Sequence, residues 1–360
     1  FAEFDEGSGG REVSTTMALT SLMRNLMRDD AFGPRVVPIV PDEARTFGMD
    51  SLFREFKIYS STGQLYEPVD HDLLLSYAEG ADGQLLEEGI TEAGSMASWI
   101  AAGTSYANLG VPMVPIYTFY SMFGFQRVGD LIWSASDSRA RGFLMGATAG
   151  RTTLMGEGLQ HQDGHSLVLA STVPACQAYD PAFAYELAAI VRDGLHRMYG
   201  DRSALRSGAG TAIDDPASEG GADVFYYITV YNENYDMPQR ADHISDIDIV
   251  SGLYRWADRP EGADHQATVL FSGPAHGAAR EAQAELSERY GVGVDLWSAT
   301  SYKRLREEAL DAERWNRLHP HGPDRVPEVT RKLSACPGPI VAVTDYMTIV
   351  PDQIARWVPG

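Results

Sequence analysis

One acidic residue stands where an acid can either support a helix or do chemistry. Glu92 follows a glycine turn and precedes Ala93 to Trp99, a run of small and apolar residues typical of a buried helix. A carboxylate in the first turn of a helix interacts favourably with the positive end of the helix dipole. A carboxylate shut away from water has a proton affinity tuned by its surroundings and can act on a ligand. The segment alone leaves both roles open.

Two aromatic residues further along the chain could form a wall beside such an acid. Tyr120 and Phe123 are three residues apart, so they share a face if their segment begins the long helix expected after the strand at 111–117. Ordinary core aromatics have the same spacing. The pair is therefore compatible with stacking on a flat ring and also with simple packing.

A glycine-bounded loop carries alternating histidine and aspartate residues. His161, Asp163 and His165 could suggest a metal site, but Gly164 argues against a helix that would bring the two histidines together. A single loop histidine is usually solvated. It can also donate hydrogen bonds and move protons near neutral pH.

An acidic pair follows a strand that the sequence predicts at 35–40. Asp42 and Glu43 come directly after this apolar segment. Ligands in α/β folds bind at the carboxyl ends of strands. A salt bridge with Arg45 is an equally simple role for these acids.

Together these segments resemble a known enzyme family. The motifs are Glu-Gly-Ile-Thr-Glu-Ala-Gly around Glu92 and the stretches at 39–49, 117–127 and 156–165. They are similar to the pyrimidine-binding half of a thiamine-diphosphate enzyme, and most similar to the homodimeric type of pyruvate dehydrogenase. That enzyme is the decarboxylating first component of a multienzyme complex. The resemblance runs nearly end to end, from Arg11 to Met347.

The resemblance implies a role for each candidate residue. Glu92 would hydrogen-bond the aminopyrimidine ring and favour its imino tautomer, so that the cofactor becomes a carbanion. Tyr120 and Phe123 would lie around that ring, with Phe123 the better stacking candidate. His161 would face the substrate, and Glu157 would support the site.

The resemblance also assigns the rim of the site. Asp42 and Glu43 would shape the charge felt by reaction intermediates, and the polar segment 62–80 would act as a lid that orders over bound cofactor. In related transketolases a histidine follows the Asp-Gly pair. Here Leu167 is near that place, which weakens a sugar-phosphate donor function.

Composition excludes several classes of partner. The net charge of −21 over 360 residues argues against a nucleic acid or an anionic membrane surface. Two cysteines, Cys176 and Cys336, make no disulfide framework and fit a reducing cytoplasm. No apolar stretch approaches the length of a membrane helix, and no signal peptide is visible. Because the chain begins at Phe1, we expect a processed or trimmed segment.

The order of elements predicts an α/β fold of two units. Apolar runs alternate with helical patterns, so we expect residues 1–240 to form a pyrimidine-binding domain with a parallel sheet flanked by helices. Residues 241–360 are expected to form a smaller transketolase-like C-terminal domain with a parallel sheet, reduced at its end. The Gly- and Ser-rich segment 201–223 is expected to be a mobile loop.

Several local elements are predicted as well. Ser14 should cap a helix running to Arg28, with Met17 on its inner side. Residues 171–173 should be a strand, and Asp180 with its following proline should cap a helix ending at Tyr199. A last helix is expected at 352–357.

One half of a thiamine-diphosphate site is missing from the sequence. Relatives hold the diphosphate through Mg²⁺ bound by a Gly-Asp-Gly motif and a downstream Asn, as hard oxygen ligands suit this ion. The chain has no Gly-Asp-Gly. We therefore expect it to be inactive alone and to need a diphosphate-binding domain or chain, in a dimer or heterotetramer.

Three functions remain in competition. The first is decarboxylation of pyruvate with transfer of the two-carbon unit to a lipoyl group, which would bring a lipoyl acyltransferase as a partner. The second transfers that unit to a sugar or a carrier protein in specialised metabolism. The third is a non-catalytic scaffold subunit, against which the joint presence of Glu92, Tyr120, Phe123 and His161 argues.

Overall fold

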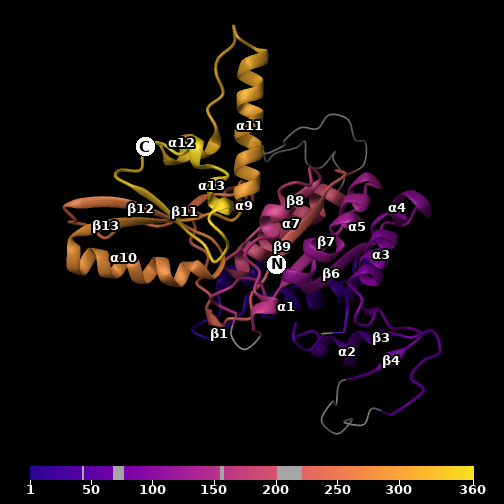
Figure 1. Ribbon diagram of the computed structural model, residues 1–360. Helices are drawn as coiled ribbons and strands as arrows, with labels where there is room; N and C mark the ends of the chain where they lie inside the picture. The colour runs from indigo at the N-terminus through magenta and orange to yellow at the C-terminus, as the bar shows by residue number, and fades with distance from the viewer. Residues whose placement is uncertain (43, 68–76, 155–157, 201–220) are drawn as a thin grey trace.

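The computed structural model describes residues 1–42, 44–67, 77–154, 158–200 and 221–360 (Figure 1). Two candidate site residues, Glu43 and Glu157, lie outside these ranges. So do residues 68–76 of the expected lid and residues 201–220 of the expected loop.

The first unit is built on a six-stranded sheet whose neighbouring strands are all parallel. The strand order is β5-β2-β6-β7-β9-β8. The strands are β2 (Val36–Val40), β5 (Leu86–Glu87), β6 (Val114–Tyr120), β7 (Phe143–Ala147), β8 (Cys176–Tyr179) and β9 (Phe225–Thr229). Most of these residues are buried, as expected for a parallel sheet covered on both faces. The α/β class is confirmed.

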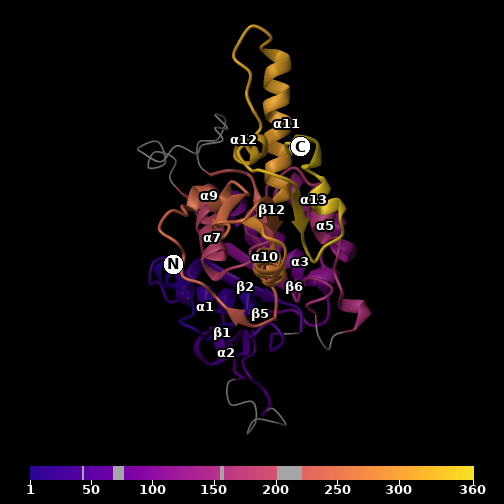
Figure 2. The same ribbon diagram turned by 90° about the vertical axis from the view of Figure 1, so that its left-hand side faces the viewer.

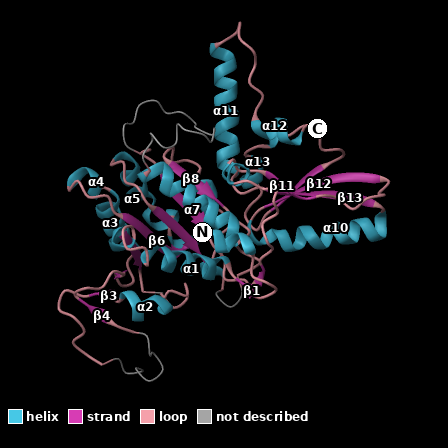
Figure 3. Ribbon diagram, turned by 180° about the vertical axis from the view of Figure 1, so that it is seen from behind, coloured by secondary structure: helices cyan, strands magenta, loops and turns pink. Residues whose placement is uncertain are grey.

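Helices cover both faces of this sheet (Figures 1 and 3). One layer contains α1 (Thr15–Met27) and α7 (Ala184–Tyr199); the other contains α3 (Glu92–Gly103), α5 (Phe125–Asp137) and α6 (Ser166–Ala170). Side chains alternate between the two layers along each strand. In β7, Phe143 and Met145 join the first core and Leu144 the second. The short α4 (Ser105–Asn108) follows α3.

Two short strands extend one edge of the sheet beyond β5. β3 (Ile58–Tyr59) pairs in parallel with β4 (Glu79–Gly80), and Ile58 also forms a bridge to Leu85, which precedes β5. Helix α2 (Asp50–Phe56) leads into β3. This extension carries both described ends of the segment 62–80 and connects it to the main sheet.

The second unit is a four-stranded sheet of order β11-β13-β12-β14. Its strands are β11 (Tyr254–Ala257), β12 (His265–Phe271), β13 (Val292–Ser298) and β14 (Ile340–Val343). Strand β11 runs antiparallel to β13, so the expectation of a purely parallel sheet is wrong. Only residues 258–264 connect β11 to β12, which is too short for the crossover that parallel strands require.

Helices also flank the second sheet, and one of them projects from it. They are α10 (His276–Tyr290), α11 (Tyr302–Leu318), α12 (Glu328–Leu333) and α13 (Ile349–Asp352). In both Figure 1 and Figure 2, α11 extends away from the body of the molecule. A small antiparallel pair, β1 (Glu12–Val13) with β10 (Tyr235–Asp236), lies outside the two main sheets.

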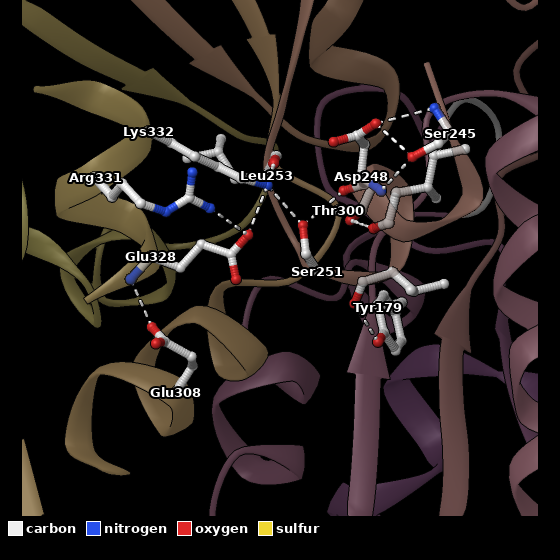
Figure 4. A network of polar contacts seen from close by, with 12 residues as sticks. Tyr179, Ser245, Asp248, Ser251, Leu253, Thr300, Glu308, Glu328, Arg331 and Lys332 are labelled. Atoms are coloured by element: carbon white, nitrogen blue, oxygen red, sulfur yellow. Dashed lines mark hydrogen bonds and ion pairs between the residues drawn. The ribbon is translucent and has the colours of Figure 1, made fainter. Parts of the chain in front are cut away.

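Helix α9 (Asp246–Val250) links the two sheets through polar contacts (Figure 4). The Tyr179 hydroxyl at the end of β8 donates to the Val250 carbonyl at 2.9 Å. Thr300 Oγ1, before α11, donates to the Ile249 carbonyl at 2.6 Å. Lys332 of α12 donates to Ser251 Oγ at 2.7 Å. The end of the first unit is thus fixed against the helices of the second.

The structure corrects four local expectations. Residues 171–173 form a turn after α6, and the strand begins at Cys176. Asp180 does not cap α7, which begins at Ala184 with Glu186 accepting from two backbone N–H groups before it. Met17 is 42% exposed, because its position turns away from the buried side of α1. The C-terminal helix is two short pieces, α13 and a 3₁₀ turn at Ala355–Trp357.

Candidate active site

The candidate residues lie at the carboxyl ends of neighbouring strands. Ile39 of β2 is in register with Tyr117 of β6, so Asp42, just after β2, and Tyr120, the last residue of β6, follow the same ends of two neighbouring parallel strands. Val40 is in register with Glu87, the last residue of β5. This edge is where ligands bind in parallel α/β sheets. The sheet therefore positions acids and aromatic rings on one rim.

Glu92 is the first residue of α3, which follows β5 after a short turn at residues 88–91. Thr91 caps the helix by accepting from the Gly94 N–H at 3.1 Å. The Glu92 side chain is only 14% exposed, and Oε1 accepts from Arg127 Nη1 at 2.9 Å. The Tyr117 hydroxyl donates to the Glu92 carbonyl at 3.4 Å. The carboxylate is thus shielded from most solvent and held by a cation.

An aromatic cluster adjoins this ion pair. The Arg127 guanidinium lies 3.8 Å from the ring centre of Phe123, a cation–π contact. The Tyr120 ring lies 5.8 Å from Phe123 and 4.6 Å from His161. Phe123 and His161 are 5.3 Å apart. Three rings therefore lie together beside the arginine that contacts Glu92.

The two aromatic residues lie close together, but not on one helix face as the sequence predicts. Tyr120 is the last residue of β6 and Phe123 ends a 3₁₀ turn at Ser121–Phe123, whereas α5 begins at Phe125. They do not share a helix face. A tight turn at the strand end, not helical periodicity, brings the rings together.

A buried aspartate fixes the loop that carries His161. Asp163 is fully buried, and its Oδ1 accepts the backbone N–H groups of His165 at 3.0 Å and Ser166 at 2.9 Å. Its own N–H donates to the Gly150 carbonyl at 2.9 Å. His165 is turned toward Gln126, at 3.3 Å, and away from His161. The loop therefore presents one histidine to the aromatic cluster.

The structure describes one of the two predicted rim acids. Asp42 is exposed, and among the described residues no ion pair joins it to Arg45. Sequence reasoning gave no role to Glu87, which is partly buried beside it. Among the residues with described positions, the Glu87 carboxyl has no hydrogen bond or ion pair. Burial, with the negative charges of Asp42 and Glu79, raises the pKa of Glu87 to about 7. The sequence shows Glu87 only as an acid after Leu85 and Leu86, and its place opposite Val40 comes from the strand pairing in the structure.

Replacing Glu87 should remove a pH dependence of stability. The unfolded carboxyl has a pKa of about 4.3. The folded chain therefore binds an extra proton between about pH 4.3 and pH 7, and its free energy of unfolding falls as pH rises through this window. Since Glu87 is partly exposed, solvent screening reduces this change in the free energy of unfolding to about 1–2 kcal/mol.

Urea unfolding at pH 5 and pH 8 tests this prediction. The free energy of unfolding of Glu87→Gln should change less with pH than that of the unmodified chain. Equal sensitivity in the two proteins would refute this, and the exposed acid Glu281→Gln serves as control.

The residues present fit one part of a thiamine-diphosphate site. A shielded carboxylate next to aromatic rings suits a flat, hydrogen-bonding heterocycle. In the described part of the chain, no group of three or more His, Cys, Asp or Glu side chains could hold a metal ion. The pyrimidine side of the cofactor therefore fits these residues. No helix within the described ranges is long and apolar enough to span a membrane.

Comparisons with known proteins place this site in a family. Residues 1–207 match a family model described as the pyruvate dehydrogenase E1 component middle domain. The chain is 51% identical over 355 residues to the pyruvate dehydrogenase E1 component of Pseudomonas aeruginosa, covering 99% of this chain and 38% of that protein. It is 45% identical over 350 residues to the Escherichia coli K12 protein of the same name, covering 97% and 37%. The chain thus spans well under half the length of the curated relatives it matches.

Solved structures support the fold. Transketolase from Campylobacter jejuni aligns with a TM-score of 0.64 and 12% identity, covering 97% of this chain and 42% of that one. A structure described as a split gene transketolase, an inactive beta4 tetramer, aligns with a TM-score of 0.52 and 15% identity, covering 97% and 94%. Since the family model covers more than half of the 360 residues, the chain belongs to the pyruvate dehydrogenase E1 component family and has its transketolase-like fold.

Proposed function

We propose that this chain supplies the pyrimidine side of a thiamine-diphosphate-dependent E1 active site that decarboxylates pyruvate. The observation that carries the proposal is the shielded Glu92 carboxylate joined through Arg127 to the rings of Phe123, Tyr120 and His161. A scaffold that had lost catalysis would have no reason to keep this arrangement at the ligand-binding edge of the sheet.

Each residue has a distinct part in the proposal. Bound thiamine diphosphate would supply the carbanion that attacks the keto acid. Glu92 would hydrogen-bond the pyrimidine ring and hold a proton there, while Phe123 and Tyr120 would keep the ring flat and dry. His161, fixed by the Asp163 loop, would face the substrate and donate a hydrogen bond or a proton to it. Asp42 would add negative charge at the rim, and Glu43 and Glu157 keep the supporting roles that the resemblance gives them.

The proposed site needs a second polypeptide region. Mg²⁺ and the diphosphate would be bound by a domain or chain outside this sequence, since no cluster of three or more His, Cys, Asp or Glu side chains in the described ranges could hold a metal ion. Two further observations support this. The chain spans 38% of its Pseudomonas relative, and the split gene transketolase structure, which it covers nearly completely, is described as an inactive tetramer. A dimer or heterotetramer would complete the site. We propose residues 1–240 and 241–360 as the two domains of the chain and the cytoplasm as its location.

The acyl acceptor has two candidates. The first is a lipoyl group carried by an acyltransferase, which is the acceptor that the sequence resemblance to pyruvate dehydrogenase implies. The alternative is a sugar or a carrier protein.

Mixing experiments test the proposal and separate the acceptors. The chain is combined with the diphosphate-binding region of an E1 protein, thiamine diphosphate, Mg²⁺ and pyruvate, and release of carbon dioxide is followed. We expect neither part alone to turn over pyruvate and the mixture to do so. Lipoyl domain or sugar phosphate is then added, and formation of acyl-lipoyl product identifies the acceptor. A mixture that assembles, binds cofactor and never consumes pyruvate would refute the proposal.

A further inference from the structure

A small cavity lies where the first unit meets the second. Its volume is about 10 Å³, and its lining comes from the end of β8, the start of α11 and the region of α13. A site of this volume holds one particle of the size of a water molecule. This cavity is separate from the rim that carries Glu92.

Three polar atoms without partners belong to residues that line this cavity. They are Asp180 Oδ2, the Tyr302 hydroxyl and Gln353 Oε1, each fully buried and without a hydrogen bond. Asp180 is 3% exposed and Tyr302 is 4% exposed. Buried polar atoms are nearly always paired, so three orphans around one small cavity indicate a bound species.

The orientation of these groups is fixed by other contacts. Thr229 Oγ1 at 2.7 Å and the Tyr231 hydroxyl both donate to Asp180 Oδ1, which leaves Oδ2 unsatisfied. Gln353 Nε2 donates to the Val350 carbonyl at 3.1 Å. A flipped amide would set Oε1 against that carbonyl, so Oε1 must be the atom without a partner.

The charge of Asp180 decides which species fits. No lysine or arginine in the described ranges forms an ion pair with it, and the ammonium of Lys303, which also lines the cavity, bonds to Glu307. Ser272 faces Asp180, but its hydroxyl donates to Thr344 Oγ1 at 3.0 Å. A buried carboxylate with only neutral donors is poorly compensated. A water molecule would pair the orphan atoms but leave the charge.

We propose that the cavity binds one dehydrated monovalent cation, potassium in the first instance, through Asp180, Gln353 and Tyr302. A single carboxylate with neutral oxygens is too weak a ligand set for a divalent ion, which prefers several carboxylates or retained waters. Potassium readily exchanges its hydration shell for neutral oxygens and is close to a water molecule in size. The site is independent of the proposed catalytic function.

The local electrostatics agree with this assignment. Burial raises the pKa of the Asp180 carboxyl and the nearby Asp345 acts in the same direction, while the hydrogen bonds from Thr229 and Tyr231 act against them. Burial alone therefore favours the neutral form of Asp180, and a cation beside it would restore the charged form. The cation would join residues of β8, α11 and α13, and so strengthen the contact between the two units.

Thermal unfolding of the full chain tests the proposal. Midpoints are measured in potassium, sodium and tetramethylammonium chloride at equal ionic strength, because tetramethylammonium screens charge but cannot enter the cavity. We expect saturating potassium to raise the midpoint by about 2–4 °C over tetramethylammonium. Asp180→Asn should abolish this difference, and the exposed control Asp242→Asn should keep it. Equal midpoints in all three salts would overturn the proposal, as would a potassium effect that survives Asp180→Asn.

A second measurement, on the unmodified chain, tests the proposal even if Asp180→Asn does not fold. Crystals of the unmodified chain soaked in rubidium chloride should show an anomalous peak between Asp180 and Gln353. The absence of a peak there would leave water or a proton on Asp180 as the occupant and would refute cation binding.

Discussion

Glu92→Gln should reduce turnover of pyruvate by the assembled enzyme by about 10²–10⁴-fold. The amide keeps an oxygen that can accept from Arg127, so the contact at 2.9 Å and the fold should survive. The amide cannot take up or release a proton at the pyrimidine ring of the cofactor, which is the proposed role of the Glu92 carboxylate. The loss should therefore appear in kcat, with little change in the unfolding midpoint of the chain.

A matched control separates this role from support of the helix dipole. Glu328 also lies in the first turn of a helix, α12, and pairs with Lys332 at 3.0 Å. Both substitutions remove a charge worth about 0.3–1 kcal/mol to a helix. Glu328→Gln should leave turnover unchanged. Similar activity in both variants would show that Glu92 serves only its helix.

Glu186→Ala should destabilise the chain by about 3–5 kcal/mol. Glu186 of α7 is fully buried, and its Oε1 accepts from the hydroxyls of Tyr254 at 2.5 Å and Ser298 at 2.6 Å. Its Oε2 accepts from the N–H groups of Ala182 at 2.6 Å and Phe183 at 3.2 Å. Truncation leaves four donors unpaired and opens a cavity between α7 and the second sheet.

Denaturant unfolding measures the loss of stability in Glu186→Ala, and two further variants provide the comparison. Glu186→Gln keeps one acceptor oxygen for some of these donors, so this variant should lose less stability than Glu186→Ala. Glu281→Ala, on the exposed side of α10, should change the free energy of unfolding by no more than about 0.5 kcal/mol. A loss at Glu186 as small as that at Glu281 would mean that the network adds nothing to stability.

Patterns carried by consecutive residues could be predicted from the sequence. Ser14 caps α1, and the apolar runs become buried parallel strands, because capping and burial depend on local residue type. Glu92, Tyr120 and His161 could be proposed as site residues because their motifs are long and resemble those of a known family. That resemblance, and not helical or strand periodicity, was the reason to expect the three residues near one another.

Features that depend on tertiary contacts could not be predicted. Asp180 reads as a helix cap before a proline, yet its side chain turns inward to Thr229 and Tyr231. Glu186 reads as an ordinary helix acid, although two distant strands supply its donors. The Arg127 contact with Glu92 joins residues 35 apart in sequence. The partners in these pairs are set by packing, which no local pattern encodes.

Calorimetric titration of thiamine diphosphate with Mg²⁺ tests the central claim most directly. The cofactor is titrated into this chain, into the diphosphate-binding region and into their mixture. We expect tight binding only in the mixture, because this chain would contribute the acid and the aromatic wall and the other region would contribute the metal and phosphate ligands. Binding by this chain alone as tight as by the mixture would contradict it.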